Sequence, residues 1–182
     1  YKMNNCLTSD ERLVIYTLSI KALRLDQYSG IKLKSGRMSP TFFNSGLFNT
    51  GESMNKLIDA YYSAIPKDIK YDGIFGPAYK GITLSSGLAM KKGGDVQFFY
   101  DRKELKDHGE GGQIVGGSIE GKNIFIIDDV MTGGKSVSDA HKLIEKNGGN
   151  VKGVAIAFDR QEVAADGSMS MSAVQRYEEE YG

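Results

Sequence analysis

The sequence has few cysteine and histidine residues and no tryptophan, and the first two shortages exclude whole classes of site. Of its 182 residues, one is cysteine (Cys6) and two are histidine. One cysteine cannot form an internal disulfide, and the histidines, His108 and His141, are not part of any cluster with the spacing of zinc ligands. We therefore expect a protein of a reducing, cytoplasmic compartment.

Two further absences concern net charge and long apolar runs. The chain carries 23 basic and 23 acidic residues, so its field gives no reason to expect nucleic acid or an anionic membrane as a partner. No apolar run approaches the roughly 20 residues that cross a bilayer, and the first residues lack the layout of a signal peptide. We expect a soluble protein in which residues 1–182 form one domain with a full core.

The N-terminal part of the sequence predicts a helix followed by a hairpin. Residues 8–11 have the T-x-x-E pattern of a capping box, and apolar residues follow at helical spacing over 13–23. We expect this helix to end at Gly30. Residues 31–34 alternate in polarity and residues 41–44 can return beside them, which predicts a hairpin.

The rest of the chain alternates between strand-like and helix-like segments. Such alternation is typical of an α/β fold with a doubly wound, mainly parallel sheet flanked by helices. The expected strands are residues 73–75, 96–100, 124–127 and 151–158, with a further segment near 113–115. The expected helices surround residues 54–61, end near residue 92, and span 136–146.

The most informative segment joins an apolar strand to two carboxylates and a glycine loop. Residues 124–127 are typical of a buried parallel strand, so Asp128 and Asp129 should emerge at its carboxyl end, where open α/β sheets bind ligands. Residues 132–136 then place backbone N–H groups at the start of a helix, which favours an anion. Acids beside an anion cradle fit a phosphorylated ribose, whose hydroxyls donate to the acids while its phosphate accepts from N–H groups.

Two other interpretations of this segment stay open. Gly134, Lys135 and Ser136 also form the end of a P-loop motif, but the position of its first glycine holds Asp129, which a triphosphate would meet. The other alternative is a strand, an Asx-rich turn and a helix N-cap without any ligand. Lys135 could add a cation at the loop or point into solvent.

Two more segments combine glycines with basic residues. Residues 76–81 place Lys80 between glycines, where the backbone can approach an anion, although an ordinary strand-to-helix turn explains the pattern as well. Residues 101–112 end in glycines that permit hinge motion, which suits a lid, although charge-rich loops are often only solvated surface. The candidate residues of this lid are Arg102, Lys103, Lys106 and His108.

Together these segments resemble a known family, the type I phosphoribosyltransferases. The signature of that family is an apolar strand, two acids, two further residues, a threonine and a small loop, and residues 126–134 match it. Four further blocks, in the same order along the chain, resemble the orotate phosphoribosyltransferases within that family. The blocks are Lys32–Asn44, Phe75–Gly81, Tyr100–Gly112 and Phe158–Glu162.

The resemblance implies an enzyme that transfers a phosphoribosyl group from phosphoribosyl pyrophosphate (PRPP) to orotate. It implies a small N-terminal hood formed by about residues 1–45, and a homodimer in which the lid serves the neighbouring subunit. Mg²⁺ would be held mainly by PRPP, so no protein metal motif is expected. The last strand and helix of the family are expected to be absent. A purine phosphoribosyltransferase and a PRPP-sensing regulator that binds nucleic acid stay open as alternatives.

The same resemblance implies a role for each candidate residue. Asp128 and Asp129 would hold the ribose hydroxyls and place negative charge near the cation that develops on the sugar. The catalytic set would be these two acids with Arg102, Lys103, Lys106 and His108. The implied PRPP-binding residues are these, together with Lys34, Tyr79, Lys80, Val130, Met131, Thr132, Gly133, Gly134, Lys135 and Ser136. The implied orotate-binding residues are Lys34, Phe42, Phe43, Thr132 and Arg160.

Two of the orotate-binding assignments have structural alternatives. One of the rings of Phe42 and Phe43 could pack in the core instead of facing a ligand. Arg160 could form an ion pair with Asp159 or Glu162 instead of binding a carboxylate or carbonyl oxygen of the substrate.

Overall fold

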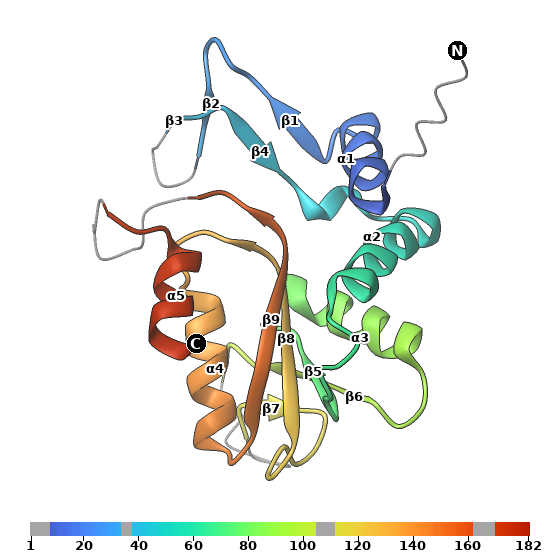
Figure 1. Cartoon of the computed structure of the whole chain (residues 1–182), viewed down its shortest axis with the longest axis vertical. Coiled ribbons are helices and arrows are strands. Elements are labelled where there is room, and N and C mark those ends of the chain that lie inside the picture. The colour runs from blue at the N-terminus through green and yellow to red at the C-terminus, as the bar shows by residue number, and fades with distance from the viewer. Residues whose placement is uncertain (1–7, 34–37, 105–111, 162–169) are drawn as a thin grey trace. The chain divides into compact units, whose positions relative to one another are not determined.

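The computed structural model describes residues 8–33, 38–104, 112–161 and 170–182 (Figure 1). The chain forms two compact units, Tyr1–Ala60 and Tyr61–Gly182. Among the described residues, no helix is long and apolar enough to cross a bilayer.

The first unit begins with helix α1 (Ser9–Ser19), which starts at the predicted capping box. Thr8 Oγ1 accepts a hydrogen bond from the N–H of Glu11 at 3.2 Å, and the Glu11 carboxylate accepts one from the N–H of Thr8 at 2.7 Å. The predicted extension of this helix to Gly30 is wrong. Lys21 adopts a φ of 60°, and a residue in this left-handed region cannot continue a right-handed helix.

The strands of the first unit pair differently from the prediction. β1 (Leu23–Leu25) pairs antiparallel with β4 (Thr41–Phe43), and β2 (Ile31–Lys32) pairs with β3 (Met38–Ser39). The predicted hairpin required β4 to pair with β2, and this part of the prediction is wrong. Pro40 separates β3 from β4 and has no N–H to donate, so the ladder is interrupted there and the chain takes a new partner strand.

Two helical segments and a small aromatic cluster complete this unit. The 3-10 helix η1 (Ser45–Leu47) and helix α2 (Gly51–Ala64) follow β4, which confirms the predicted helix, although the last turn of α2 belongs to the second unit. The Phe48 ring centroid lies 6.2 Å from that of Phe43 and 6.3 Å from that of Tyr16. These rings give the first unit an aromatic core of its own.

The second unit is built on a five-stranded sheet of order β7-β6-β5-β8-β9. All neighbouring strands are parallel except β6 and β7, which are antiparallel. The predicted mainly parallel sheet is therefore confirmed. The strands are β5 (Gly73–Phe75), β6 (Gln97–Asp101), β7 (Ile114–Val115), β8 (Asn123–Met131) and β9 (Asn150–Asp159).

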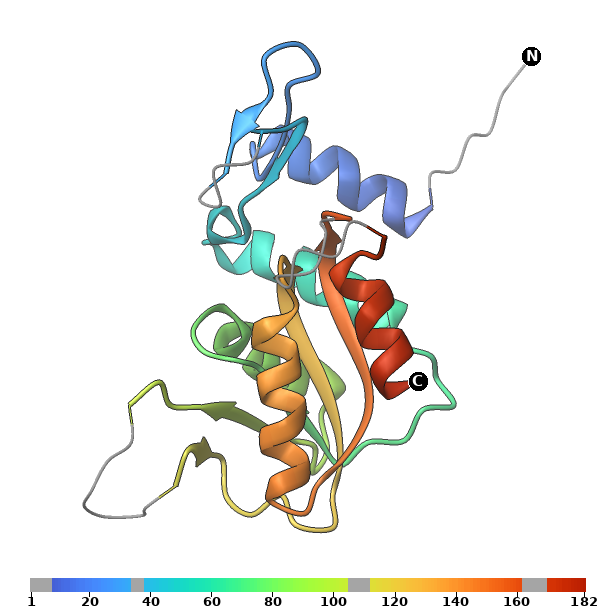
Figure 2. The ribbon, with the colours of Figure 1, turned by 90° about the vertical axis from the view of Figure 1, so that its left-hand side faces the viewer.

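Helices cover both faces of this sheet. α4 (Lys135–Lys146) and α5 (Ala173–Tyr181) lie on one face and α3 (Lys80–Lys92) lies on the other (Figures 1 and 2). α3 and α4 confirm predicted helices, whereas α5 was not predicted. His141 holds α5 against α4, because its Nδ1 bonds the Tyr177 hydroxyl and its ring stacks on a second tyrosine of α5.

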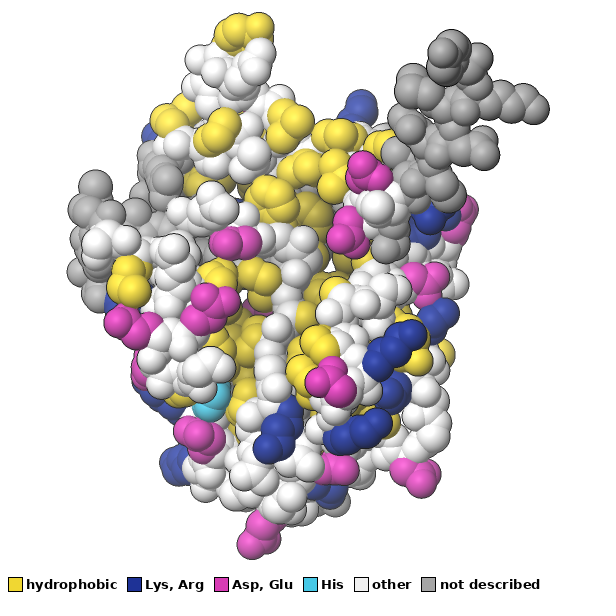
Figure 3. Space-filling model, in the orientation of Figure 1, with side chains coloured by type: hydrophobic (Ala, Val, Ile, Leu, Met, Phe, Trp, Pro, Cys, Tyr) yellow, Lys and Arg dark blue, Asp and Glu magenta, His cyan; other side chains and the backbone are white. Residues whose placement is uncertain are grey.

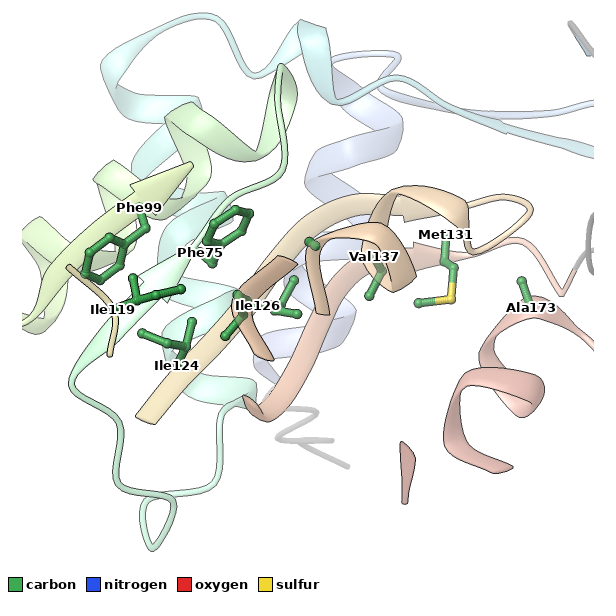
Figure 4. Packing of buried hydrophobic residues seen from close by; sticks show 10 residues of the cluster. Phe75, Phe99, Ile119, Ile124, Ile126, Met131, Val137 and Ala173 are labelled. Carbon is green, nitrogen blue, oxygen red and sulfur yellow. The ribbon is translucent and has the colours of Figure 1, made fainter. Parts of the chain in front are cut away.

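The core on the α4 face fixes the ends of the strands relative to the helices. Phe75, Ile124 and Ile126 of the sheet pack with Val137 and Ile144 of α4, and each of these five side chains is at most 1% exposed (Figure 4). Such dry packing leaves little freedom for the segment between β8 and α4. On the surface, acidic and basic side chains both occur on the face shown in Figure 3, as expected from the balanced charge.

Candidate active site

The acid pair lies inside strand β8 and not beyond its end. The predicted strand ended at Ile127, but β8 continues to Met131 because β9 pairs with it as far as the Met131–Asp159 pair. Asp128 and Asp129 are therefore held by the ladder of the sheet. Because successive strand residues point to opposite faces, the two carboxylates lie on different sides of the sheet.

Asp128 points toward the α4 side. Its side chain is 6% exposed, and its Oδ1 accepts a hydrogen bond from the N–H of Asp129 at 2.9 Å. The pKa of the Asp128 carboxyl is raised to about 6, chiefly by burial and with a smaller contribution from the negative charge of Asp129, while hydrogen bonds from the Asp129 N–H and the Ser136 hydroxyl oppose the shift. This carboxyl therefore ionises at a higher pH than an exposed acid does.

Asp129 points toward the α3 side. It is 7% exposed, its Oδ2 lies 2.8 Å from Lys80 Nζ, and its Oδ1 accepts a hydrogen bond from the N–H of Val130 at 2.8 Å. Lys80 begins helix α3, so this ion pair joins two of the segments that the sequence singled out. The carboxylate is held in one orientation by a cation and an amide.

Tyr61 supports the acid pair through a hydrogen bond to its backbone, and sequence reasoning missed this residue. Its hydroxyl donates a hydrogen bond of 2.7 Å to the backbone carbonyl of Asp128. Burial raises the pKa of Tyr61 well above its usual value, and the charges of Asp129 and Asp128 raise it further. In the sequence this tyrosine was only one apolar position of a predicted helix, so no local signal marked it.

The loop between β8 and α4 presents the N-terminus of a helix. The N-cap of α4 is Gly134, with a φ of 75°, a conformation that residues with a side chain rarely adopt. Within the described part of the chain, no side chain caps this helix. The N–H of Ser138 bonds the Gly134 carbonyl, so the N–H groups of residues 135–137 precede the first bond of the helix and can face an anion.

The side chain of Lys135 points away from this cradle. Its Nζ lies 2.9 Å from Asp139 Oδ2 one turn along α4, and its side chain is 82% exposed. Of the two orientations that the sequence left open, the structure has the solvent-facing one. The backbone of the loop, and not this lysine, supplies the groups that suit an anion.

The loop between β5 and α3 is closed by contact between two glycines. A Cβ on Gly76 would lie 1.9 Å from the carbonyl oxygen of Gly81, so no side chain fits at that position. The N–H of Gly76 donates to the Phe99 carbonyl, and that of Gly81 donates to Pro77. The glycines therefore serve backbone packing, and the expectation that they open the backbone to an anion is not met at these two N–H groups.

In the same loop, the side chain of Tyr79 is exposed and the N–H of Ala78 bonds a neighbouring strand. The Ala78–Tyr79 peptide is cis, and the Tyr79 side chain is 74% exposed. The N–H of Ala78 donates to Asp101 Oδ1 at 2.6 Å. Asp101 ends strand β6, and sequence reasoning did not single it out as a site residue.

The predicted lid begins at Asp101. The Oδ2 of Asp101 lies 3.3 Å from Lys103 Nζ, and the N–H of Arg102 donates to the Gln113 carbonyl at 2.8 Å. The two ends of the predicted lid are therefore joined by backbone pairing. Of the other predicted site residues, Lys34, Lys106 and His108 lie outside the described residues.

The predicted base-binding residues fall in both units. In the first unit, Phe43 is 4% exposed and its ring contacts Phe48, which agrees with the alternative that one ring packs in a core, whereas Phe42 is half-buried. In the second unit, Arg160 directly follows β9 and is half-buried. The Oδ1 of its neighbour Asp159 accepts the N–H of Gln161.

Comparison with known proteins shows the family to which the chain belongs. Residues 47–177 match the family model of the phosphoribosyl transferase domain. The matched stretch includes β5, β8 and both loops that follow them. The chain belongs to the phosphoribosyltransferase family.

Within the phosphoribosyltransferase family, the chain is similar to orotate phosphoribosyltransferases. The orotate phosphoribosyltransferase of Kluyveromyces lactis is 48% identical over 170 residues, which cover 88% of this chain and 74% of that protein. That of Stenotrophomonas maltophilia is 43% identical over 175 residues, covering 94% and 78%. The crystal structure of orotate phosphoribosyltransferase from Francisella tularensis has a TM-score of 0.77 at 36% identity, covering 93% of this chain and 81% of that one. The resemblance to orotate phosphoribosyltransferases is thus confirmed over most of the chain.

Proposed function

We propose that the protein transfers the 5-phosphoribosyl group of PRPP to orotate, giving orotidine 5'-phosphate and pyrophosphate, a step of de novo pyrimidine synthesis. The observation that carries this proposal is a buried acid pair in β8 followed directly by the N-terminus of α4, which no side chain of the described residues caps. The names of the similar proteins support orotate as the acceptor.

The proposed ligand needs both kinds of group that this segment supplies. Ribose hydroxyls donate hydrogen bonds, so they suit the carboxylates of Asp128 and Asp129. The 5-phosphate accepts hydrogen bonds, so it suits the N–H groups of residues 132–136 at the positive end of the α4 dipole. The dry core beneath β8 and α4 would keep the acids and the anion cradle at a fixed spacing.

The acid pair would also act on the transition state. When the bond between ribose C1 and pyrophosphate breaks, positive charge grows on the sugar ring before the nitrogen of the base arrives. Carboxylates fixed at the hydroxyls stabilise that charge without reorganising. Because burial raises the pKa of Asp128 to about 6, its negative charge is fully developed only above that pH.

The leaving pyrophosphate would bind to cations that have carboxylate partners of their own. Lys80 pairs with Asp129, and Lys103 pairs with Asp101. Both lysine side chains are about half exposed, so a diphosphate could reach them and compete with the carboxylates. The remaining residues proposed for this role are Tyr79, Arg102, Lys106 and His108.

Magnesium is proposed as the metal that accompanies PRPP. Within the described residues, no group of three or more His, Cys, Asp and Glu side chains could hold a metal ion. Mg²⁺ would be held mainly by the diphosphate and ribose hydroxyls of PRPP, so the protein would supply few direct ligands to such an ion. When bound, the ion would neutralise charge on the leaving group.

Further parts of the proposal concern the base, the assembly and the location. Lys34, Phe42, Phe43, Thr132 and Arg160 are proposed to bind orotate. We also propose one phosphoribosyltransferase domain with a hood of about residues 1–45, and a homodimer in which each lid serves the neighbouring subunit. A cytoplasmic location is proposed because a chain with one cysteine needs no oxidising compartment.

One assay separates orotate from other acceptors. The protein is incubated with PRPP and Mg²⁺, and released pyrophosphate is measured with orotate, uracil, adenine or hypoxanthine, and with no base as the control. We expect release with orotate and only background release with the others. Release driven by a purine would contradict the proposal, as would salt-dependent binding to nucleic acid without any turnover.

A further inference from the structure

Asp101 holds two segments at once. It is the last residue of β6, and its side chain is 12% exposed. Its Oδ1 accepts the N–H of Ala78 at 2.6 Å, and its Oδ2 lies 3.3 Å from Lys103 Nζ. One carboxylate therefore joins the loop before α3 to the start of the predicted lid.

The two contacts differ in strength and permanence. The bond to Ala78 is short, charge-assisted and made by a half-buried backbone group that needs a partner. The contact with Lys103 is longer, and the lysine side chain is 45% exposed, so water screens the pair and little is lost when it breaks. A diphosphate can therefore take Lys103 from Asp101 without disturbing the bond to Ala78.

We propose that Asp101 is a positioning residue for the leaving group. Its Oδ1 orients the peptide of the 76–81 loop, and its Oδ2 holds Lys103 next to that loop until a diphosphate takes the ammonium. The inference rests on the proposed function, in which both segments bind pyrophosphate. The negative charge of Asp101 would itself repel pyrophosphate. In this proposal the carboxylate nevertheless places the groups that attract pyrophosphate.

A set of variants separates the two contacts. Asp101→Asn keeps an oxygen for the N–H of Ala78 but removes the charge, and Asp101→Ala removes both. Asp95→Asn is the matched control, because Asp95 is exposed and lies just before the opposite end of β6. The readouts are the KM values for PRPP and orotate, the Kd of magnesium pyrophosphate by calorimetry, and the melting temperature.

The proposal predicts a selective loss with partial rescue. Asp101→Ala should raise the KM for PRPP and the Kd of pyrophosphate about tenfold or more, while the KM for orotate changes less than about twofold. Asp101→Asn should recover most of this loss, and Asp95→Asn should match the wild type. Equal losses for both substrates, no loss in Asp101→Ala, or no recovery in Asp101→Asn would each overturn the proposal.

A double-mutant cycle tests the exchange of Lys103 even where Asp101→Ala does not fold. Lys103→Met should weaken pyrophosphate binding about tenfold, because it removes a cation and leaves the charge of Asp101 facing the ligand. Adding Asp101→Asn to Lys103→Met should then tighten binding, so the two changes are not additive. Additive losses would contradict the proposal. These binding measurements need no turnover, so a failure of orotate-dependent activity would count against the proposed function alone.

Discussion

The loops before α3 and α4 follow two neighbouring parallel strands, β5 and β8, yet they use their polar groups differently. In the loop before α4, the N-cap is a glycine, no side chain in the described ranges caps the helix, and the N–H groups of residues 135–137 precede the first helical bond. In the loop before α3, the N–H groups of Gly76, Ala78 and Gly81 already have acceptors, and Lys80 is paired with Asp129. The N-terminus of α4 thus presents N–H groups ahead of its first helical bond, whereas the named N–H groups and the lysine of the α3 loop already have partners.

The difference matches the two ends of the proposed substrate. The 5-phosphate stays attached to the sugar throughout the reaction, so a rigid cradle that is ready in advance suits it. Pyrophosphate must be bound and then released, so ammonium groups that can move between carboxylates and the ligand suit it better. The comparison predicts that changes in the α4 loop and in the acid pair affect function differently from changes in the α3 loop.

The largest effect is expected for Asp129→Asn. This change removes the charge that would stabilise the sugar cation and also the partner of Lys80, so kcat should fall by a factor of about one hundred or more. The melting temperature should stay close to that of the wild type. Asp139→Asn is the control, because Asp139 is exposed and pairs only with Lys135 among the ion pairs of the described residues. Wild-type kinetics in Asp129→Asn would refute the role of this acid.

Gly76→Ala should destabilise the protein strongly. The added Cβ would lie 1.9 Å from the Gly81 carbonyl oxygen, so the backbone of the α3 loop must move, at a cost of about 2–4 kcal/mol. Gly51→Ala is the matched control, because a Cβ there meets nothing within 4 Å. Urea unfolding of both variants measures the difference. Equal stability of the two would show that the loop is not closed by contact between its glycines.

Asp128→Asn should stabilise the protein at neutral pH while it impairs activity. Burial raises the pKa of this carboxyl from 3.8 to about 6, so the native state binds its proton more tightly than the unfolded state does. The proton on Asp128 therefore contributes its full stabilisation of the native state below about pH 4. This contribution, about 3 kcal/mol, is lost as the pH rises through 6.

Asparagine cannot ionise, so the variant avoids that loss. Its free energy of unfolding should exceed that of the wild type by up to about 3 kcal/mol at pH 7.5 and should not differ below pH 4. Urea unfolding at the two pH values tests this difference. A gain that does not depend on pH, or a loss at neutral pH, would contradict the assignment of a raised pKa to Asp128.

The smallest effect is expected for Lys135→Ala. The Lys135 side chain is exposed and paired along its own helix, so stability should change by less than about 0.5 kcal/mol. The KM for PRPP should change less than about twofold, because the anion cradle consists of backbone groups. A large rise in that KM would show that the lysine turns toward the phosphate.

The sequence predicted the elements whose signals are local. The capping box at Thr8, the strand before the acid pair and the helix from Lys135 are where pattern and turn chemistry placed them. Two errors came from tertiary pairing that no local pattern contains. The first helix ends before the apolar spacing does, because Lys21 is left-handed and the chain then forms β1, which pairs with β4. β8 runs past the acids because β9 continues beside it.

Helix α5 and two supporting residues were missed for different reasons. Ser172 and Gln175 form a capping box that is visible in the sequence, so α5 could have been predicted from it. Tyr61 and Asp101 act through contacts with Asp128 and Ala78, which are distant in sequence, and only the folded chain brings these residues together. Supporting residues of this kind carry no motif of their own.

The most direct test of the account is a crystal structure with orotidine 5'-phosphate bound. The account predicts phosphate oxygens within hydrogen-bonding distance of the N–H groups of residues 132–136, and ribose hydroxyls on the carboxylates of Asp128 and Asp129. A nucleotide whose sugar lies away from β8, or whose phosphate contacts other groups while the N-terminus of α4 faces only water, would contradict it.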